Sequence, residues 1–187
     1  MSDKKYGVIL ADPPWSYRNN GVEGAAAGQY ATTSTKELAE LPINDLALPD
    51  SVLLMWFTWP TLPDALQLVN AWGFDYVTGF PWIKLDKHPV TDLFGETRMY
   101  PFYGIGFWVR GCSEPVLIAR KGKPELPKYD WLGLLSIKMK HSRKPDNLHH
   151  YAESLNGPYL ELFARRPREG WDVWGNEVDS TIEMVTP

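Results

Sequence analysis

Short apolar runs, separated by polar and by glycine- and proline-rich stretches, recur along the chain and predict its strands. Val8-Ile9-Leu10-Ala11 has the length and branching of a strand that is buried on both faces. Similar runs predict strands at residues 51–58, 74–85, 115–120, 132–137 and 159–164, and the last of these is the final strand that we expect. Such runs are typical of strands inside a parallel sheet.

Helical signals lie between these runs. The sequence Ser34-Thr35-Lys36-Glu37 is a capping box, which opens a short helix that ends near residue 41. Residues 60–72 carry large apolar side chains at helical spacing, and a proline followed by an aspartate starts a further helix over residues 145–155. Because strands alternate with helices, the pattern predicts a three-layer α/β domain with a mostly parallel sheet.

Two long segments without periodicity, residues 16–33 and 86–106, are predicted to be loops beside a functional site. A shorter loop is expected between Pro42 and Pro49. Residues 1–178 are expected to form a single domain, and residues 179–187 a flexible tail.

Composition narrows the class of protein. The 187 residues, of which 44% are hydrophobic and 22% charged, are ordinary for a soluble globular protein. The formal net charge of −4 argues against a non-specific nucleic-acid binder, but it leaves room for a local basic patch. The single cysteine excludes a disulfide framework and a cysteine-based zinc site. No apolar run reaches the ~18–20 residues of a membrane span, so we expect a cytoplasmic, intracellular protein with no membrane partner.

The first strand ends abruptly at Asp12-Pro13-Pro14-Trp15. Two prolines fix the backbone and remove two amide donors, so they hold a carboxylate, a carbonyl and an indole at the carboxyl end of a strand. Open α/β sheets bind their ligands there. The carboxylate of Asp12 and the carbonyl of Asp12 or Pro13 suit the two N–H donors of an aromatic amine, and Trp15 offers a wall for stacking. The alternative is a plain turn in which Trp15 belongs to the core.

A basic run at residues 138–144 is the best candidate for holding phosphates on this acidic chain, and Lys140, Arg143 and Lys144 are its candidate contacts. In the second long loop, Arg98 and Tyr100 are expected to touch nucleic acid. The adjacent His149 and His150 lack a helically spaced second ligand, so a solvated helix face is expected there, and no metal.

The sequence resembles the MT-A family, which is named for the seventy-kilodalton catalytic subunit of the eukaryotic mRNA adenosine methyltransferase and includes many bacterial and phage proteins. The resemblance rests on Asp-Pro-Pro-Trp at 12–15, Glu-Leu-Phe-Ala-Arg at 161–165 and Trp-Gly-Asn-Glu at 174–177, supported by Trp-Ile-Lys at 82–84 and by His-Ser-Arg-Lys-Pro-Asp at 141–146. It implies a Rossmann-like methyltransferase fold of permuted order, in which the catalytic motif precedes the cofactor motif. It also implies S-adenosylmethionine as the cofactor.

The resemblance further implies roles for individual residues. Asp12 to Trp15 would form the catalytic corner, and Tyr30 and Lys84 would contact the substrate base. The cofactor would be held by Asp12, Lys84, Phe163, Arg165, Asn176 and Glu177. Gly106-Phe107-Trp108 and Glu114 also match a family segment. The structural alternative is a turn, a packed aromatic side chain and a carboxylate that begins a strand, and we prefer this alternative for Phe107 and Trp108.

The leading hypothesis is methyl transfer from S-adenosylmethionine to the 6-amino group of adenine in nucleic acid, with DNA favoured and RNA as the alternative. Two further hypotheses stay open: methylation of the 4-amino group of cytosine, and a non-catalytic nucleic-acid-binding partner of an active homologue. The sequence contains neither Gly-x-Gly-x-x-Gly nor Gly-x-x-x-x-Gly-Lys, which counts against a dinucleotide cofactor and an ATPase. Whether the protein forms a homo- or hetero-oligomer stays open.

Overall fold

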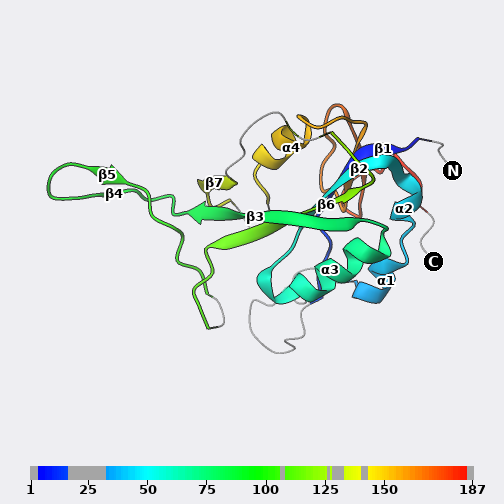
Figure 1. Cartoon of the computed structure of the whole chain (residues 1–187). Coiled ribbons are helices and arrows are strands. Elements are labelled where there is room, and N and C mark those ends of the chain that lie inside the picture. Colours follow the sequence, from blue (N-terminus) through cyan, green and yellow to red (C-terminus); the bar gives the residue numbers. More distant parts are fainter. Residues whose placement is uncertain are drawn as a thin grey trace.

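A computed structural model of the chain describes residues 4–16, 33–105, 108–125, 127, 133–139 and 143–184. A seven-stranded sheet runs through it in the order β7-β3-β6-β2-β1-β8-β9 (Figure 1). Its strands are β1 (Tyr6–Ala11), β2 (Ala47–Trp56), β3 (Asp75–Leu85), β6 (Ser113–Lys121), β7 (Leu134–Ile137), β8 (Tyr159–Leu162) and β9 (Trp171–Trp174). All neighbours are parallel except β6, which is antiparallel to β2 and β3. The prediction of a mostly parallel sheet is confirmed.

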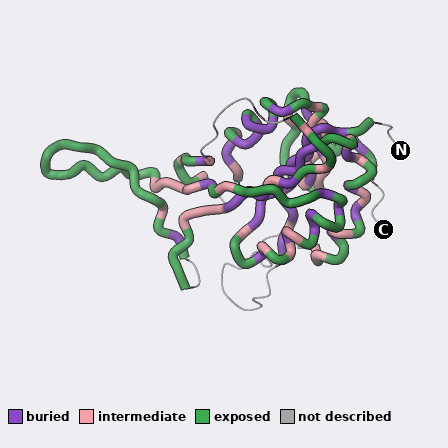
Figure 2. The backbone as a smooth tube through the Cα atoms, viewed as in Figure 1, coloured by how far each residue is buried: buried purple, intermediate pink, exposed green. Residues whose placement is uncertain are grey.

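Helices cover both faces of this sheet, as a three-layer fold requires. Figure 1 shows α1 and α3 on one side and α4 on the other. The helices are α1 (Thr35–Ala39), α2 (Ile43–Leu46), α3 (Leu62–Ala71), which follows the 3-10 turn η2 (Trp59–Thr61), and α4 (Asn147–Ala152). Adjacent residues of β1 point to opposite faces, so Ile9 belongs to the core under α1 and α3 and Leu10 to the core under α4. All six residues of β1 are accordingly buried, and Figure 2 shows buried residues gathered in the middle of the molecule.

The predicted capping box at the start of α1 is confirmed. The Ser34 hydroxyl accepts from the amide of Glu37 (3.2 Å), and the Glu37 carboxylate accepts from the amide of Ser34 (2.9 Å). Thr35 then donates to the Asp64 carboxylate of α3 (2.9 Å). The cap thus fixes α1 where it can pack on α3.

Three expectations about elements need correction. The loop between Pro42 and Pro49 is instead α2 followed by the first residues of β2. The segment 159–164 is not the final strand, because β9 follows it. Within the stretch expected to be a tail, Ile182 is buried in the core (8% exposed) and the Thr181 amide donates to the Val173 carbonyl (2.9 Å).

The parallel pairing of β1 with β8 brings together two motifs that are far apart in the sequence. Ala11 lies opposite Leu162, so the residues that follow each of them, Asp12 and Phe163, leave the sheet at the same edge. Gly7 permits the close approach of the turn before β8, because a Cβ there would lie 2.3 Å from the Asn156 carbonyl oxygen. The carboxyl ends of β2, β3 and β9 and the amino end of antiparallel β6 meet at this edge as well.

Two projections leave the sheet beside the arrowhead of β3 (Figure 1). One is a long hairpin made of β4 (Val90–Thr91) and β5 (Thr97–Arg98), which pair in antiparallel fashion. The other is the loop that leads back to β6. Both begin and end at the edge where the strand ends gather.

Candidate active site

The corner after β1 holds Asp12 as the sequence predicts. Its two carboxylate oxygens both accept from the Lys144 ammonium group at 2.8 Å. The Pro13 carbonyl accepts from the amide of Trp15 (2.8 Å) and the Pro14 carbonyl from the amide of Thr33 (3.1 Å). One of the two lone pairs of the Pro13 carbonyl is therefore in use, and the other can accept a second donor.

Asp12 belongs to a chain of alternating charges. Lys144 also pairs with Glu114 (3.4 Å), and Glu114 pairs with Lys84 at hydrogen-bonding distance. The four side chains are only 18–25% exposed. Two carboxylates and two ammonium groups make the cluster neutral, which suits a neutral base as the ligand.

The electrostatics of this cluster keep it ionised. Burial pushes the pKa of the Glu114 carboxyl upward, but the ammonium groups of Lys144 and Lys84 outweigh burial and hold that pKa below its usual range. Burial likewise works to lower the pKa of Lys144, and the carboxylates of Asp12 and Glu114 outweigh it and raise that pKa. Both charges therefore persist at neutral pH.

Two tryptophans line the same cluster. The Lys144 ammonium group lies 5.2 Å from the ring centre of Trp56, and the Lys84 ammonium group lies 4.9 Å from that of Trp82. Trp56 and Trp82 contact each other edge to face with ring centres 6.0 Å apart. The two ammonium groups of the cluster therefore lie against a pair of aromatic rings that pack on each other.

Trp15 does not offer an open ring face. It is 7% exposed, packs in the core under α1 and α3, and donates its indole N–H to the Trp56 carbonyl (3.1 Å). The expected stacking wall is therefore wrong in this structure, and the alternative in which Trp15 belongs to the core is confirmed. Its hydrogen bond ties the corner after β1 to the end of β2.

The candidate cofactor residues lie after β8 and β9. The amide of Asp12 points to the Leu162 carbonyl (3.5 Å), so Phe163 follows directly beside the corner after β1. The ring of Phe163 packs edge to face on Trp174 (5.5 Å).

Farther along, the Arg165 guanidinium lies 3.5 Å from the Glu177 carboxylate. Arg165, Asn176 and Glu177 are all exposed, as a site for a diffusible ligand requires. This donor set fits S-adenosylmethionine. A guanidinium pairs with the carboxylate of its methionine part. A side-chain amide can donate to a ribose hydroxyl or accept from it, and a carboxylate accepts from ribose hydroxyls. The partly buried ring of Phe163 adds apolar surface between these groups and Asp12.

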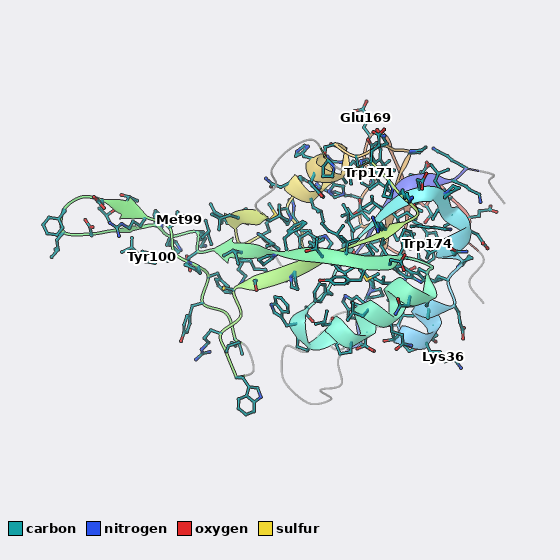
Figure 3. All side chains as sticks on the ribbon, viewed as in Figure 1. Lys36, Met99, Tyr100, Glu169, Trp171 and Trp174 are labelled. Atoms are coloured by element: carbon teal, nitrogen blue, oxygen red, sulfur yellow. The ribbon has the colours of Figure 1, made fainter. Side chains whose placement is uncertain are left out.

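The remaining predicted contacts are more dispersed. Arg98 lies in the hairpin and pairs with Glu96 (2.5 Å), away from the charged cluster. Tyr100 is 50% exposed at the foot of the hairpin (Figure 3). Arg143 is exposed next to Lys144. Tyr30 and Lys140 lie outside the described residues.

Lys144 differs from its predicted role, and Glu114 has partners that the sequence does not indicate. Lys144, expected to hold phosphates, points to Asp12 instead, because pairing with two carboxylates stabilises its buried charge. Glu114 lies at the start of β6, as a carboxylate that begins a strand would, and it also joins the two lysines. The signal that could have identified Glu114 is its isolation, because no other acidic residue occurs between Glu96 and Glu125.

Two further expectations need correction. The expected solvated helix face holds for His150, which is exposed, but not for His149, which is 7% exposed and whose ring nitrogen Nε2 contacts the Glu161 carboxylate (2.8 Å). Trp108 is not packed, since its side chain is fully exposed. Among the described residues no group of three or more His, Cys, Asp or Glu side chains could hold a metal ion. No helix in the same part of the chain is long and apolar enough to cross a membrane.

Comparison with known proteins gives a consistent result. The sequence model of the MT-A70 family matches residues 6–177. The type II methyltransferase M.MunI of a Mycoplasma species is 32% identical, over 98% of this chain and 82% of the relative.

The N6-methyladenosine RNA methyltransferase MTA1 of Pyricularia oryzae is 30% identical over 95% of the chain, and the human N(6)-adenine-specific methyltransferase METTL4 is 29% identical over 94%. The chain spans 48% and 38% of the length of these two.

Proposed function

The chain belongs to the MT-A70 family, and we propose that it is an enzyme that transfers a methyl group from S-adenosylmethionine to the 6-amino group of adenine in nucleic acid, with DNA as the favoured substrate. The observation that carries this proposal is the parallel pairing of β1 with β8, which places the amine-binding corner at Asp12 beside the cofactor segment that begins at Phe163. The name of M.MunI supports methyl transfer and that of METTL4 supports adenine as the base, whereas the name of the fungal relative supports RNA as the alternative substrate.

In this proposal the protein's main task is alignment. Bound S-adenosylmethionine supplies an electrophilic methyl group on a sulfonium. Asp12 and the Pro13 carbonyl accept the two N–H bonds of the adenine amine, so that the nitrogen lone pair points toward the cofactor segment. The Asp12 carboxylate then takes up the proton that the amine releases after the methyl group has been transferred. Excluding water from this corner strengthens both hydrogen bonds.

Lys144 and Glu114 position the catalytic carboxylate. Lys144 donates to both Asp12 oxygens, which fixes the plane of the carboxylate. Glu114 holds Lys144 from the other side. Lys84 pairs with Glu114 and is the last member of the cluster. In this proposal its ammonium group faces the substrate base.

Cofactor contacts are assigned to the segments after β8 and β9. Arg165 would bind the methionine carboxylate, while Asn176 and Glu177 would bind the ribose hydroxyls. Phe163 would pack between these groups and Asp12. The ion pair between Arg165 and Glu177 holds this polar edge together before the cofactor arrives.

The test is methyl transfer from labelled S-adenosylmethionine to DNA and, in parallel, to RNA, followed by identification of the modified nucleoside by mass spectrometry. We expect N6-methylated adenine nucleosides from the DNA reaction, and none with Asp12→Ala. Methylated cytosine would contradict the assignment of the base. Failure of the wild-type protein to methylate either polymer would contradict the proposal as a whole.

A further inference from the structure

The segment 103–111, of which residues 103–105 and 108–111 are described, lies between two residues that are hydrogen-bonded to the backbone of Lys84, a member of the charged cluster. The amide of Phe102 donates to the Lys84 carbonyl (2.7 Å), and the Lys84 amide donates to the Cys112 carbonyl (2.8 Å). Any molecule that this loop contacts is therefore held next to the candidate active site.

The base of the loop is closed by two glycines. Gly104 and Gly111 form an antiparallel bridge, and a Cβ on Gly104 would lie 2.3 Å from the Gly111 carbonyl oxygen. The two sides of the loop can approach this closely only because glycine has no side chain. The loop is the second of the two projections in Figure 1.

Large apolar side chains on this loop face solvent. Trp108 is fully exposed, Ile105 is 96% exposed and Val109 is 75% exposed. Trp108 also has φ of +62°, a conformation that costs a bulky residue energy and that clusters at functional sites. An indole held out on a strained backbone next to an active site indicates a contact with a partner.

Charge around the loop favours a polyanion as that partner. No acidic residue occurs between Glu96 and Glu114, although the whole chain carries a net charge of −4. The Arg110 guanidinium lies 4.8 Å from the ring centre of Tyr103, and the Lys138 ammonium group lies 3.7 Å from that of Phe102. Cations next to aromatic rings combine attraction for phosphates with surfaces for bases.

The proposed reaction requires a residue that helps to extrude the target base from the base stack. In a duplex the adenine amine is hidden inside the base stack, so the base must leave the stack to reach Asp12. Proteins that open a stack insert apolar side chains between neighbouring bases. Trp108 is the described residue that best meets this need, since it is large, flat, exposed and attached to the backbone of Lys84 through the loop.

We propose that the substrate is double-stranded DNA and that Trp108 enters the base stack beside the target adenine, where it fills the space that the extruded base leaves. Arg110 contacts the DNA backbone next to this point. The inference rests on the proposed function, and it goes further by naming the duplex as the substrate and Trp108 as the residue that opens it.

The experiment compares methyl transfer to native and to heat-denatured genomic DNA that lacks adenine methylation, for the wild type and for Trp108→Ala. Denatured DNA already presents unstacked bases, so the ratio of the rates on native and denatured DNA isolates the opening step. We expect Trp108→Ala to lower this ratio at least tenfold and Trp108→Phe to restore most of it. The matched control is Phe94→Ala, an aromatic residue that is 93% exposed at the other projection and for which no change in the ratio is expected.

The outcomes separate the two proposals. An unchanged ratio for Trp108→Ala, or a wild type that modifies only denatured DNA, would overturn the role of Trp108 and leave methyl transfer standing. A wild type that modifies neither form of DNA, nor RNA, would overturn the proposed function and this inference with it. Equal melting temperatures of wild type and Trp108→Ala, expected because the side chain is fully exposed, show that a lowered ratio does not come from unfolding.

Discussion

Lys144 joins the two carboxylates of the candidate site, since it lies 2.8 Å from Asp12 and 3.4 Å from Glu114. The sequence alone indicates a positive charge at this position but not its partners. Pairing depends on which strand ends meet in space, and Glu114 comes from a strand that runs opposite to its neighbours. For the same reason the isolation of Glu114 among the acidic residues could mark it in the sequence but could not show which lysines it meets.

We predict that Lys144→Met lowers kcat by about tenfold to a hundredfold, which corresponds to the loss of ~1.5–3 kcal/mol from a hydrogen bond to a charged group. KM for the nucleic acid should change little, because Lys144 acts through Asp12. Steady-state kinetics measure the two constants separately. Lys144→Arg should recover part of the rate, and Lys36→Met, at an exposed lysine of α1 (Figure 3), should have no effect. A fall in affinity with an unchanged kcat would instead assign Lys144 to binding phosphates.

The pH dependence of stability tests the ionisation of Glu114. Its pKa in the folded protein lies below the usual 4.5, so the ionised carboxylate contributes stability above that pH, and this contribution is lost as the pH falls through the folded-state pKa. The Glu114→Gln variant lacks this contribution at every pH. We therefore predict that its melting temperature falls furthest below that of the wild type at neutral pH, and that the difference shrinks as the pH falls below 4.5. A difference that stays constant with pH would show that Glu114 acts without its charge.

At the scale of elements, most strands and helices could be predicted because their cores are continuous apolar runs or amphipathic repeats. The missed strand, β9, has only four residues and alternates buried and half-buried side chains, so it could not be distinguished from a loop that leads into the cofactor motif. Pro49 also misled the prediction. It is tolerated inside β2 because the pairing of β2 with β6 begins only at Ser51 and because the register with β1 shifts between Ala47 and Val52, so Pro49 is aligned with no residue of either strand.

The capping box of α1 can be tested at the same scale. Ser34→Ala removes the hydroxyl that accepts the Glu37 amide, and we predict a loss of about 1 kcal/mol. In a chain of this size such a loss lowers the melting temperature by about 2–4 °C. Calorimetry measures the shift, and Ser34→Thr, which keeps a capping hydroxyl, should shift the melting temperature less. An unchanged melting temperature for Ser34→Ala would mean that packing of α1 on α3 alone sustains the helix.

At the scale of the whole molecule, the class of fold follows from the alternation of elements, but the order of the strands does not. Asp12 and Phe163 are neighbours only because β1 and β8 pair in register. The sequence contains both motifs, but without the structure only the resemblance to a known family indicates that they belong to one site. The fully exposed position of Trp108 likewise depends on how the loop folds back to Lys84.

The most direct test of the central claim is the single-turnover rate of methyl transfer by Asp12→Asn, with S-adenosylmethionine and DNA both at saturating concentration. Asparagine has nearly the shape of aspartate, but its amide turns one acceptor into a donor that opposes the N–H bonds of adenine. The account predicts a rate about a hundredfold or more below that of the wild type. A rate within threefold of the wild type would contradict the claim that the Asp12 corner binds the adenine amine.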